Sequence, residues 1–349
     1  MSLPEPRRLL LVKLSSIGDV VQSLPVASAL RRRFPEAYLA WAVGPAAADV
    51  VVGHPALDRV LVVGGSPTQE ADGADVLPAL TAVRELRRAL RRYDFDTTLD
   101  IQGLFKSALV AWLTGAPTRV GFRTLHEGTF LLNNRRLVPY RKDVHAVDSY
   151  LDFAEVLGAE RAPVEFRLAI SGADGEVVDQ LLAGHRELVA LIPGARWESK
   201  MWPAERFAKV ADALSEQFGL TAVVTGAAGD AELAARIGAA ARSPIVDLTG
   251  RTTLKQAAEL LRRCRVTVGN DTGPLYLSSA VGTRTVGLFG PSDARRLGPY
   301  GDGHAKVVAE VDCAPCRNRT CRRRTCMESI SPEQVIEAAA NLLADGQGV

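Results

Sequence analysis

The stretch that decides the fold is "LLLVKLSSIGDVVQSLP", residues 9–25. It begins as an apolar run, which predicts a buried strand, breaks into small residues at positions 15–18, and then presents one carboxylate, Asp19. Ligands of open α/β sheets bind outside the carboxyl ends of the strands. The stretch therefore predicts a strand whose end loop carries chemistry, followed by a helix that starts near Pro25.

The same alternation of short apolar runs and helical patterns continues along the chain. In the first half, "YLAWAV", "RVLVVG" and "TTLDIQG" predict strands, whereas "LPVASALRRRF" and "VLPALTAVRELRRALRRY" predict helices. The second half repeats the scheme from "LVALIPG" through "TRTVGLFG". Such alternation is typical of a parallel sheet covered by helices. We therefore expect an α/β chain with two doubly wound, Rossmann-like sheets.

The boundary between the two domains is expected near residue 165. A helix over "HAVDSYLDFAEVLGAE" and an extended connector over "RAPVEFRLAI" separate the two halves, which gives domains 1–165 and 166–349. The tail "SPEQVIEAAANLLA" predicts a last helix with Ser331 as its N-cap and Pro332 at its first position. That helix is a candidate for packing back on the first domain.

Bulk composition excludes some classes of protein. The chain has 349 residues, with 42 Lys and Arg against 40 Asp and Glu, so its formal charge is only +2 and nothing indicates a general binder of nucleic acid. No apolar run reaches the ~18 residues that span a bilayer, and the N-terminus lacks the pattern of a signal peptide. We expect a cytoplasmic protein.

The most informative loop of the second half is "GNDTGPLYLSSAVG", which follows the strand ending at Val268. It presents Asp271, Thr272, Gly273 and Pro274 at a predicted helix start. A helix N-terminus gathers free amides and a partial positive charge, which suits a phosphate oxygen. The alternative is that Asp271 or Thr272 only caps the helix.

Three further strand ends of the second half carry similar loops. "PGARWESKMWPAERF" contains Gly194 and Lys200, and a lysine in this place can meet a diphosphate, although it can also be an ordinary solvated residue. "TGAAGDAE" supplies Gly226, and "DLTGRTTL" supplies Thr249 and Gly250. Four such loops favour a nucleotide site. Neither G-x-G-x-x-G nor G-x-x-x-x-G-K-[ST] is present, which disfavours a dehydrogenase and a P-loop enzyme.

The loop of the first half offers a different chemistry. Ser16 and Gly18 leave room for a sugar beside Asp19. A lone carboxylate facing a nucleotide-diphosphate site is what a general base needs to take a proton from an acceptor hydroxyl. Capping of the next helix is the alternative role for Asp19. The "DFD" of residues 94–96 is assigned to a turn and not to a metal site.

With these residues in place, the sequence resembles the bacterial heptosyltransferases of lipopolysaccharide core synthesis, glycosyltransferase family nine. The matching stretches include "LLLVKLSSIGDVVQSLPVASALRRRFPEA", "LDIQGLFKSAL", "RVGF", "NNRRL", "PGARWESKMWPAERFAKV" and "GNDTGPLYLSSAVGTRTVGLFGPSD". They span nearly the whole chain in the family's order. Taken together, "LVKLSSIGDVV", "IQGLFKSA" and "HEG…LNN" are most similar to the type that adds the first heptose to Kdo.

The resemblance implies a GT-B fold, with two Rossmann-like domains and the active site in the cleft between them. It also implies metal-independent, inverting transfer from a nucleotide sugar, usually ADP-heptose, with no cofactor. Asp19 would be the base. Lys200 would act with Asp271, Thr272, Gly273 and the following Pro274 and Tyr276 on the donor diphosphate.

One position departs from the family pattern. A histidine is common in "D-T-G-P-x-H", where this chain has Tyr276. A tyrosine can donate a hydrogen bond but does not become cationic near neutral pH. A related transferase that uses another nucleotide sugar or another cell-surface glycan is therefore the alternative function.

Acceptor contacts are expected from the first domain. "DIQGLFKSAL" offers Asp100, Gln102 and Lys106, and "TRVGFRTLHEG" offers Arg119 and Arg123. Cations among them can pair with the carboxylates and phosphates of a lipid-anchored, Kdo-containing acceptor, and ordinary surface charge is the alternative. The resemblance implies a peripheral enzyme at the cytosolic face of the inner membrane.

The function does not account for "CAPCRNRTCRRRTC". Its four cysteines, Cys313, Cys316, Cys321 and Cys326, suit tetrahedral zinc by number but lack a second C-x2-C pair, so free thiols are the main interpretation and structural zinc the alternative. The interleaved arginines can meet an anionic surface or remain solvated. A nucleic-acid or metal-binding protein built around this segment would leave the strand-end loops unexplained.

Overall fold

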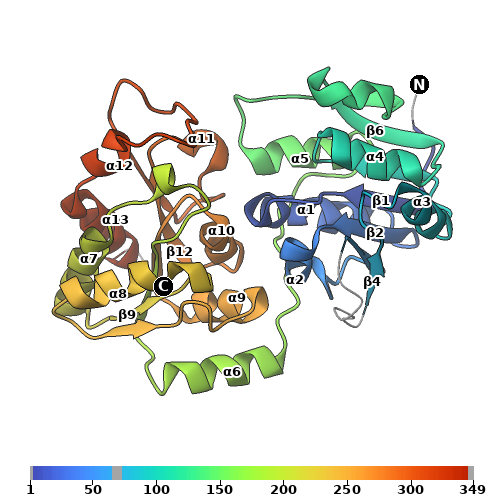
Figure 1. The fold of residues 1–349 in the computed structure, drawn as a ribbon. Helices are drawn as coiled ribbons and strands as arrows, with labels where there is room; N and C mark the ends of the chain where they lie inside the picture. The colour runs from blue at the N-terminus through green and yellow to red at the C-terminus, as the bar shows by residue number, and fades with distance from the viewer. Residues whose placement is uncertain (1–2, 65–72, 345–349) are drawn as a thin grey trace. The chain divides into compact units, whose positions relative to one another are not determined.

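The chain folds into two compact units in the computed structural model, Met1–Ala169 and Ile170–Val349, which Figure 1 draws in blue to green and in yellow-green to red. The structure describes residues 3–64 and 73–344. Each unit has its own parallel sheet with helices around it, as the alternation of the sequence predicts.

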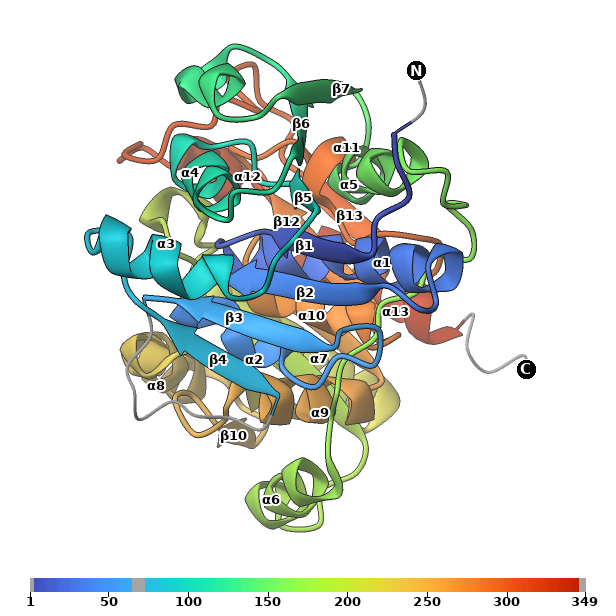
Figure 2. The same ribbon diagram turned by 90° about the vertical axis from the view of Figure 1, so that its right-hand side faces the viewer.

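Unit 1, residues 1–169, contains a seven-stranded parallel sheet in the order β4-β3-β2-β1-β5-β6-β7 (Figure 2). Its strands are β1 (Arg8–Val12), β2 (Tyr38–Val43), β3 (Arg59–Val63), β4 (Ala74–Leu77), β5 (Thr97–Asp100), β6 (Thr118–Arg123) and β7 (Arg135–Pro139). Its helices are α1 (Ile17–Arg33), α2 (Ala48–Val51), α3 (Val83–Arg91), α4 (Phe105–Leu113) and α5 (Ala146–Glu155), with 3-10 turns η1 (Pro45–Ala47) and η2 (His126–Leu131).

The central place of β1 in this sheet accounts for its apolar sequence. The central strand β1 is buried at Leu9–Val12 because it has a strand on each side and helices above and below. A strand covered on both faces reads as a continuous apolar run, as "LLLV" does. Helix α1 packs against α5, and α3 packs against α4.

Two predicted helix starts in unit 1 are wrong. Helix α1 begins at Ile17 and carries Pro25 in its interior, so Asp19 lies in its first turn. The hydrogen bonds that Asp19 accepts at this end, described below, stabilise the earlier start. The pattern from Val76 onward is helical only from Val83, because Val76 and Leu77 belong to β4, which pairs with β3. Pro78 follows directly, and a residue before proline prefers an extended backbone.

Unit 2, residues 170–349, contains a six-stranded parallel sheet in the order β10-β9-β8-β11-β12-β13. Its strands are β8 (Leu188–Ile192), β9 (Thr221–Val224), β10 (Ile245–Asp247), β11 (Val266–Asn270), β12 (Arg284–Phe289) and β13 (Ala305–Val308). Its helices are α6 (Gly172–Leu182), α7 (Ala204–Phe218), α8 (Ala231–Ala240), α9 (Leu254–Arg263), α10 (Gly273–Ala280), α11 (Ala294–Leu297), α12 (Thr325–Ser329) and α13 (Pro332–Ala344), with 3-10 turns η3 (Glu198–Lys200) and η4 (Ala228–Asp230).

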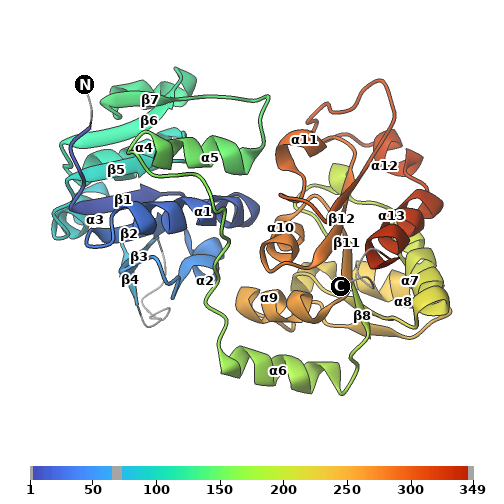
Figure 3. The same cartoon turned by 180° about the vertical axis from the view of Figure 1, so that it is seen from behind.

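The last helix, α13, begins as predicted. Gln334 N donates to Ser331 Oγ at 3.2 Å, and Ser331 N donates to Gln334 Oε1 at 2.9 Å, which is a capping box. The helix packs against α7 and against β11, β12 and β13 of its own unit (Figure 3). Its buried Val335, Ala339 and Leu343 belong to the core of unit 2.

Candidate functional site

The strand order of unit 1 reverses between β1 and β5, and such a reversal is where an open α/β sheet binds ligands. The two end loops at this point are joined by hydrogen bonds. Gln102 Oε1 accepts from the backbone N–H of Leu14 at 2.6 Å and of Ser15 at 3.2 Å. Lys106 Nζ lies 3.0 Å from Ser15 Oγ. The structure therefore brings Gln102 and Lys106 to the loop that precedes Asp19.

Asp19 is the third residue of α1 and uses both carboxylate oxygens. Oδ2 accepts from the backbone N–H of Ser16 at 3.1 Å and from Ser16 Oγ at 2.8 Å. Oδ1 accepts from Tyr150 Oη at 2.9 Å. One oxygen thus caps the helix, as the alternative interpretation predicts, while the other is held by a residue of α5.

A buried lysine stands behind this carboxylate. Lys13 is 3% exposed, and its Nζ donates to Tyr150 Oη at 2.8 Å and lies 3.4 Å from the carbonyl oxygen of Ile101. The same ammonium lies 4.0 Å from the centre of the Tyr150 ring. Lys13, Tyr150 and Asp19 therefore form a chain of polar contacts from the core to the start of α1.

Sequence reasoning missed both Lys13 and Tyr150. The available signal for Lys13 is a single cation inside the apolar run "LLLVKL", because a lysine is almost never fully buried without a partner. No local signal marks Tyr150, which lies 131 residues from Asp19 in the chain.

The surroundings keep Asp19 ionised. Burial raises the pKa of Asp19, but the charge of Lys13 and the hydrogen bonds from Ser16 and Tyr150 outweigh it, so the pKa lies below its ordinary value of 3.8. A nearby cation and donated hydrogen bonds both favour a carboxylate. At neutral pH, Asp19 is thus a proton acceptor, although a weaker base than an unperturbed aspartate.

The other predicted residues of unit 1 have different environments. Asp100 is fully buried, accepts from Gly103 N at 3.1 Å and from Asn133 Nδ2 at 3.0 Å, and has its pKa raised by burial. Arg119 donates to the carbonyl oxygens of Ala116 and Leu132, and Arg123 is exposed. Asp100 thus shapes the loops behind the site, and acceptor contacts by Arg119 and Arg123 stay predictions.

In unit 2 the strand order reverses between β8 and β11. Asn270, the last residue of β11, ties the two end loops together, since its Nδ2 donates to the carbonyl oxygen of Pro193 at 2.7 Å and its Oδ1 accepts from Trp202 N at 3.1 Å. The next residue, Asp271, forms an ion pair with Lys200, with Nζ 2.5 Å from Oδ2. The loops that carry Lys200 and Asp271 therefore meet at this reversal.

Asp271 also accepts a hydrogen bond from Tyr276 Oη through its other oxygen, Oδ1. The side chain of Asp271 is 4% exposed, whereas that of Lys200 is 15% exposed. An ammonium has three donors, and Asp271 accepts one of them. Asp271 thus orients Lys200 and Tyr276, and Lys200 is the member of the pair with more access to a ligand.

Trp197 supports Lys200 from the side. The ring centre of Trp197 lies 4.8 Å from Lys200 Nζ and 4.3 Å from the guanidinium carbon of Arg319. Arg324 pairs with Glu198 of the same loop at 3.2 Å. The arginine- and cysteine-rich segment, residues 313–326, therefore packs beside Lys200. No local sequence pattern predicts this contact.

Helix α10 starts at this point with Thr272 as N-cap and Pro274 in its first turn. Thr272 has an extended backbone and makes no side-chain capping hydrogen bond. The first N–H groups of a helix lack partners within the helix and carry its positive dipole end. The start of α10 can thus accept an oxyanion next to Lys200.

The predicted glycines of unit 2 allow close packing of the neighbouring loops. Gly194 and Gly226 both lie against the carboxylate of Asp230, which would have to move to admit a Cβ at either position. Gly250 has φ +68°, and a Cβ on it would lie 2.7 Å from Ala228 Cα. Thr249 Oγ1 donates to Asp247 Oδ1 at 2.7 Å. Donor contacts by these residues stay predictions.

The four clustered cysteines are free thiols. Cys326 is buried at α12, and burial raises the pKa of its thiol, with smaller contributions from Cys313, Cys316 and Cys321. Within residues 3–64 and 73–344, no three His, Cys, Asp or Glu side chains are grouped so that they could hold a metal ion. Structural zinc at this segment stays a hypothesis.

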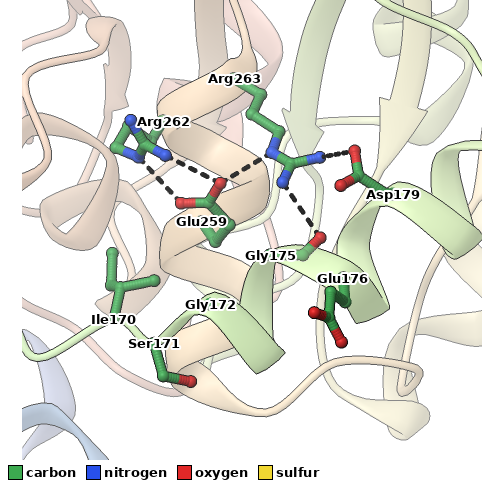
Figure 4. Close-up of a pocket in the computed structure, with 9 residues that line it drawn as sticks. All are labelled: Ile170, Ser171, Gly172, Gly175, Glu176, Asp179, Glu259, Arg262 and Arg263. Carbon is green, nitrogen blue, oxygen red and sulfur yellow. Dashed lines mark hydrogen bonds and ion pairs between the residues drawn. The ribbon is translucent and has the colours of Figure 1, made fainter.

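A pocket of about 580 Å³ lies between α6 and α9, away from the predicted residues. In Figure 4, Glu259 lies between the guanidinium groups of Arg262 and Arg263, and Arg263 also reaches Asp179 and the carbonyl oxygen of Gly175. Both arginines that line the pocket are therefore already paired with acceptors of the protein itself. It offers an incoming anion no uncompensated charge.

No helix in the described part of the chain has the length and apolarity to cross a membrane.

Comparison with known proteins gives a consistent result. Residues 83–327 match the model of glycosyltransferase family 9 (heptosyltransferase). Lipopolysaccharide heptosyltransferase 1 of Pseudomonas aeruginosa is 29% identical over 316 residues, which cover 90% of this chain and 87% of that protein.

Two solved structures from Escherichia coli show the fold. An ADP-heptose lipopolysaccharide heptosyltransferase II has a TM-score of 0.79 at 23% identity, over 98% of this chain and 100% of that one. A heptosyltransferase with bound ADP has a TM-score of 0.75 at 23% identity, over 96% and 99%. The two parallel sheets form the GT-B fold, as the resemblance predicts.

Proposed function

Because the chain belongs to glycosyltransferase family 9, we propose that it transfers a heptose from ADP-heptose to the inner core of lipopolysaccharide. The names of its relatives support this donor and this product. One observation carries the proposal. Each sheet bears a group suited to one half of the reaction at its own reversal point, an ionised Asp19 in unit 1 and a Lys200–Asp271 pair in unit 2.

In the proposed reaction, Asp19 acts as the general base. Its carboxylate takes the proton of an acceptor hydroxyl while that oxygen attacks the anomeric carbon of the heptose. The bond between the anomeric carbon and the diphosphate oxygen breaks at the same time, and its electron pair leaves with ADP. Attack occurs on the face opposite the leaving group, so the anomeric configuration inverts.

The departing diphosphate gains negative charge in this step. Lys200 and the first amides of α10 would stabilise that charge, because fixed cations and dipoles stabilise a transition state without reorganising. Asp271 would hold Lys200 in place through their ion pair, and Tyr276 would hold Asp271 through its hydrogen bond. Direct donor contacts by Asp271, Pro274 and Tyr276 stay predictions. Ser16, Gly18, Thr272 and Gly273 remain our candidates for further donor contacts.

We further propose that this step needs no divalent metal, since Lys200 and the α10 dipole supply positive charge where a metal otherwise would. Turnover should then be unchanged, within about twofold, after dialysis against EDTA. Added Mg²⁺ or Mn²⁺ should not raise it either. A loss of activity that Mg²⁺ restores would assign the leaving-group role to a metal instead.

The acceptor we favour is Kdo of a lipid-anchored inner core, at the cytosolic face of the inner membrane. Support comes from the resemblance of "LVKLSSIGDVV", "IQGLFKSA" and "HEG…LNN" to the type that adds the first heptose to Kdo. Gln102 and Lys106 contact residues 14 and 15, in the loop just before Asp19, and are the best-supported acceptor contacts. A mass-spectrometric product assay with ADP-heptose and a Kdo-bearing acceptor tests this choice directly.

A second candidate is transfer of another sugar by the same chemistry. Tyr276 favours it, because a tyrosine stands where the family often has a histidine, and its hydroxyl is engaged with Asp271. Comparing the turnover of several nucleotide sugars separates the candidates. A higher kcat/KM for a donor other than ADP-heptose would select the second.

The base assignment has its own test. Asp19→Asn preserves the size of the side chain and an oxygen for the Ser16 cap but removes the proton acceptor. Turnover should fall by at least ~10²-fold with donor KM nearly kept, which is the usual contribution of a general base. Turnover close to that of the wild type would exclude Asp19 as the base.

A further inference from the structure

Exposed apolar side chains are concentrated in one part of unit 1. Among the described residues, nine large apolar side chains are exposed, and seven of them lie between residues 105 and 140. The most exposed are Leu125 at 70% and Leu131 at 73%. Large apolar side chains gathered on one surface mark interaction sites, whereas isolated ones need no explanation.

The elements that carry these side chains are neighbours. Phe105 and Trp112 are two helical turns apart on α4, so they face the same way. Leu125, Phe130 and Leu131 belong to η2 and its preceding residue, and η2 packs against α4 and β6. The edge strand β7 follows, with exposed Leu137, and Tyr140 comes just after it. Figure 2 shows α4, β6 and β7 at one end of the sheet of unit 1.

The rest of the unit fixes η2 in this position. Phe105 N donates to Glu127 Oε2 at 2.9 Å, which ties η2 to the start of α4. Asn133, two residues after η2, donates to the buried Asp100 at 3.0 Å. Gly121 of β6 allows this approach, because a Cβ there would collide with the Asn133 side chain. The apolar surface is therefore built on a fixed base.

The charge of the same segment is strongly positive. Residues 105–142 contain seven Lys or Arg against one Glu, a formal charge of +6, although the whole chain carries only +2. Lys106, Arg123, Arg135, Arg136 and Lys142 are exposed. No ion pair recorded for the described part of the chain involves any of these five. The rest of the chain is net acidic, so the positive charge is local.

We propose that these exposed residues between 105 and 142, the α4–β7 surface, dock on an anionic phospholipid bilayer. Leucine and aromatic side chains enter the interfacial layer, while the arginines and lysines meet lipid headgroups. A nucleic acid would not require exposed leucines, and an apolar protein partner would not require five exposed cations. The inference rests on the proposed function, which already needs a lipid-anchored acceptor, and it names the surface that brings the enzyme to it.

Sedimentation of the full chain with lipid vesicles tests the proposal. The chain should sediment with vesicles that contain phosphatidylglycerol and no acceptor, much less with pure phosphatidylcholine, and less as salt is raised. Arg135→Glu together with Arg136→Glu should weaken this binding at least ~10-fold, since one basic residue near an anionic surface contributes about fivefold. Leu125→Ser together with Leu131→Ser should weaken it to a similar extent.

Matched controls come from unit 2. Val308→Ser removes an exposed apolar side chain, 44% accessible, and Arg186→Glu reverses an exposed cation, and both should bind vesicles as the wild type does. Undiminished binding by the two double variants would overturn the proposal. Binding only to vesicles that contain the acceptor would also overturn it, because the surface would then recognise the acceptor and not the bilayer.

A second readout separates this inference from the proposed function. Transfer of sugar to a lipid-free acceptor should be the same for the wild type and the Leu125→Ser, Leu131→Ser variant. If vesicle binding follows the prediction while no heptose is transferred, the docking surface stands and the proposed function fails. If transfer occurs while the wild type ignores anionic vesicles, the reverse holds.

Discussion

Asp19 depends for its charge on a residue that does not reach the surface. Lys13 directly follows β1, and its buried ammonium contacts the Ile101 carbonyl group and the Tyr150 side chain. A buried ammonium without a carboxylate nearby is very costly, and Asp19 is the carboxylate whose pKa it lowers. The same electrostatic attraction therefore stabilises the buried lysine and helps to keep the proposed base deprotonated.

A substitution at Lys13 tests this dependence. Lys13→Met removes the charge that lowers the pKa of Asp19, and burial, which raises it, then acts with less opposition. Because a base is active only when deprotonated, activity is lost as pH falls through the pKa of Asp19. The acidic limb of kcat/KM should therefore move to higher pH, from below the ordinary value of 3.8 towards neutrality.

Lys106→Met is the matched control for this experiment. Lys106 is exposed and contacts the same loop through Ser15 Oγ, but it is not among the groups that shift the pKa of Asp19. It should change acceptor KM and leave the acidic limb in place. An acidic limb that is the same in Lys13→Met and the wild type would show that Lys13 does not set the charge of Asp19. Circular dichroism of each variant checks that it folds.

Site residues next to predicted strands could be found from the sequence, whereas their partners from distant parts of the chain could not. Asp19, Lys200 and Asp271 lie just after predicted strands, where the neighbouring strand and helix patterns are visible in the sequence. Their partners are not: Tyr150 reaches Asp19 across 131 residues, and Lys200 meets Asp271 across 71. Asp100 looked like a site residue because it ends a strand, yet it is fully buried, which depends on how Asn133 packs.

At the scale of elements, the segment of residues 313–326 has a position that suggests a role. Arg319 stacks on Trp197, and Arg324 pairs with Glu198, so two arginines of the segment hold the loop that carries Lys200. The backbone N–H of Arg317 donates to the carbonyl oxygen of Pro291 at 2.8 Å, which ties the segment to the loop after β12. The segment thus helps to fix the position of the loop that carries Lys200, at the proposed diphosphate site.

The contribution of these contacts can be measured as a change in affinity for ADP. Arg319→Ala should weaken ADP binding about 2–5-fold, because an exposed cation–π contact contributes about 0.5–1 kcal/mol. Arg322→Ala is the control, since Arg322 lies three residues away, is exposed, and has no contact with Trp197 among the described interactions. Isothermal titration with ADP compares the two. Equal losses for both variants would point to general electrostatic attraction and not to support of Lys200.

Elements with a complete local pattern were predictable, and those that depend on tertiary contacts were not. Strands β1, β2, β8 and β11 are apolar runs, and α13 carries its cap in the sequence. The pattern predicts that α1 starts near Pro25, but the hydrogen bonds between Asp19 and Ser16 stabilise a start at Ile17. The pattern around β4 predicts a helix, but pairing with β3 overrides this weak local preference and a strand forms.

At the scale of the whole molecule, the two units divide the proposed reaction. Unit 1 holds the carboxylate and the positively charged α4–β7 surface, whereas unit 2 holds the lysine, the α10 terminus and the loops that suit a nucleotide. Under the proposed function, this division would let a chain of net charge +2 serve both an anionic donor and an anionic membrane. Its positive charge is concentrated at particular sites, and the chain as a whole has little net charge.

The division predicts where a nucleotide without its sugar acts. ADP should slow amide hydrogen exchange in unit 2, at the loops around residues 194–200, 226–230 and 271–274, and leave the sheet of unit 1 unchanged. At a concentration of 100 times its Kd, ADP raises the cost of opening its own site by about 2.7 kcal/mol, which slows exchange there up to ~100-fold. Lys200→Ala should reduce this protection at equal ADP concentration, while Asp19→Asn should not. Protection confined to residues 14–19 would mean that the nucleotide binds unit 1, and the assignment of the two units would then have to be exchanged.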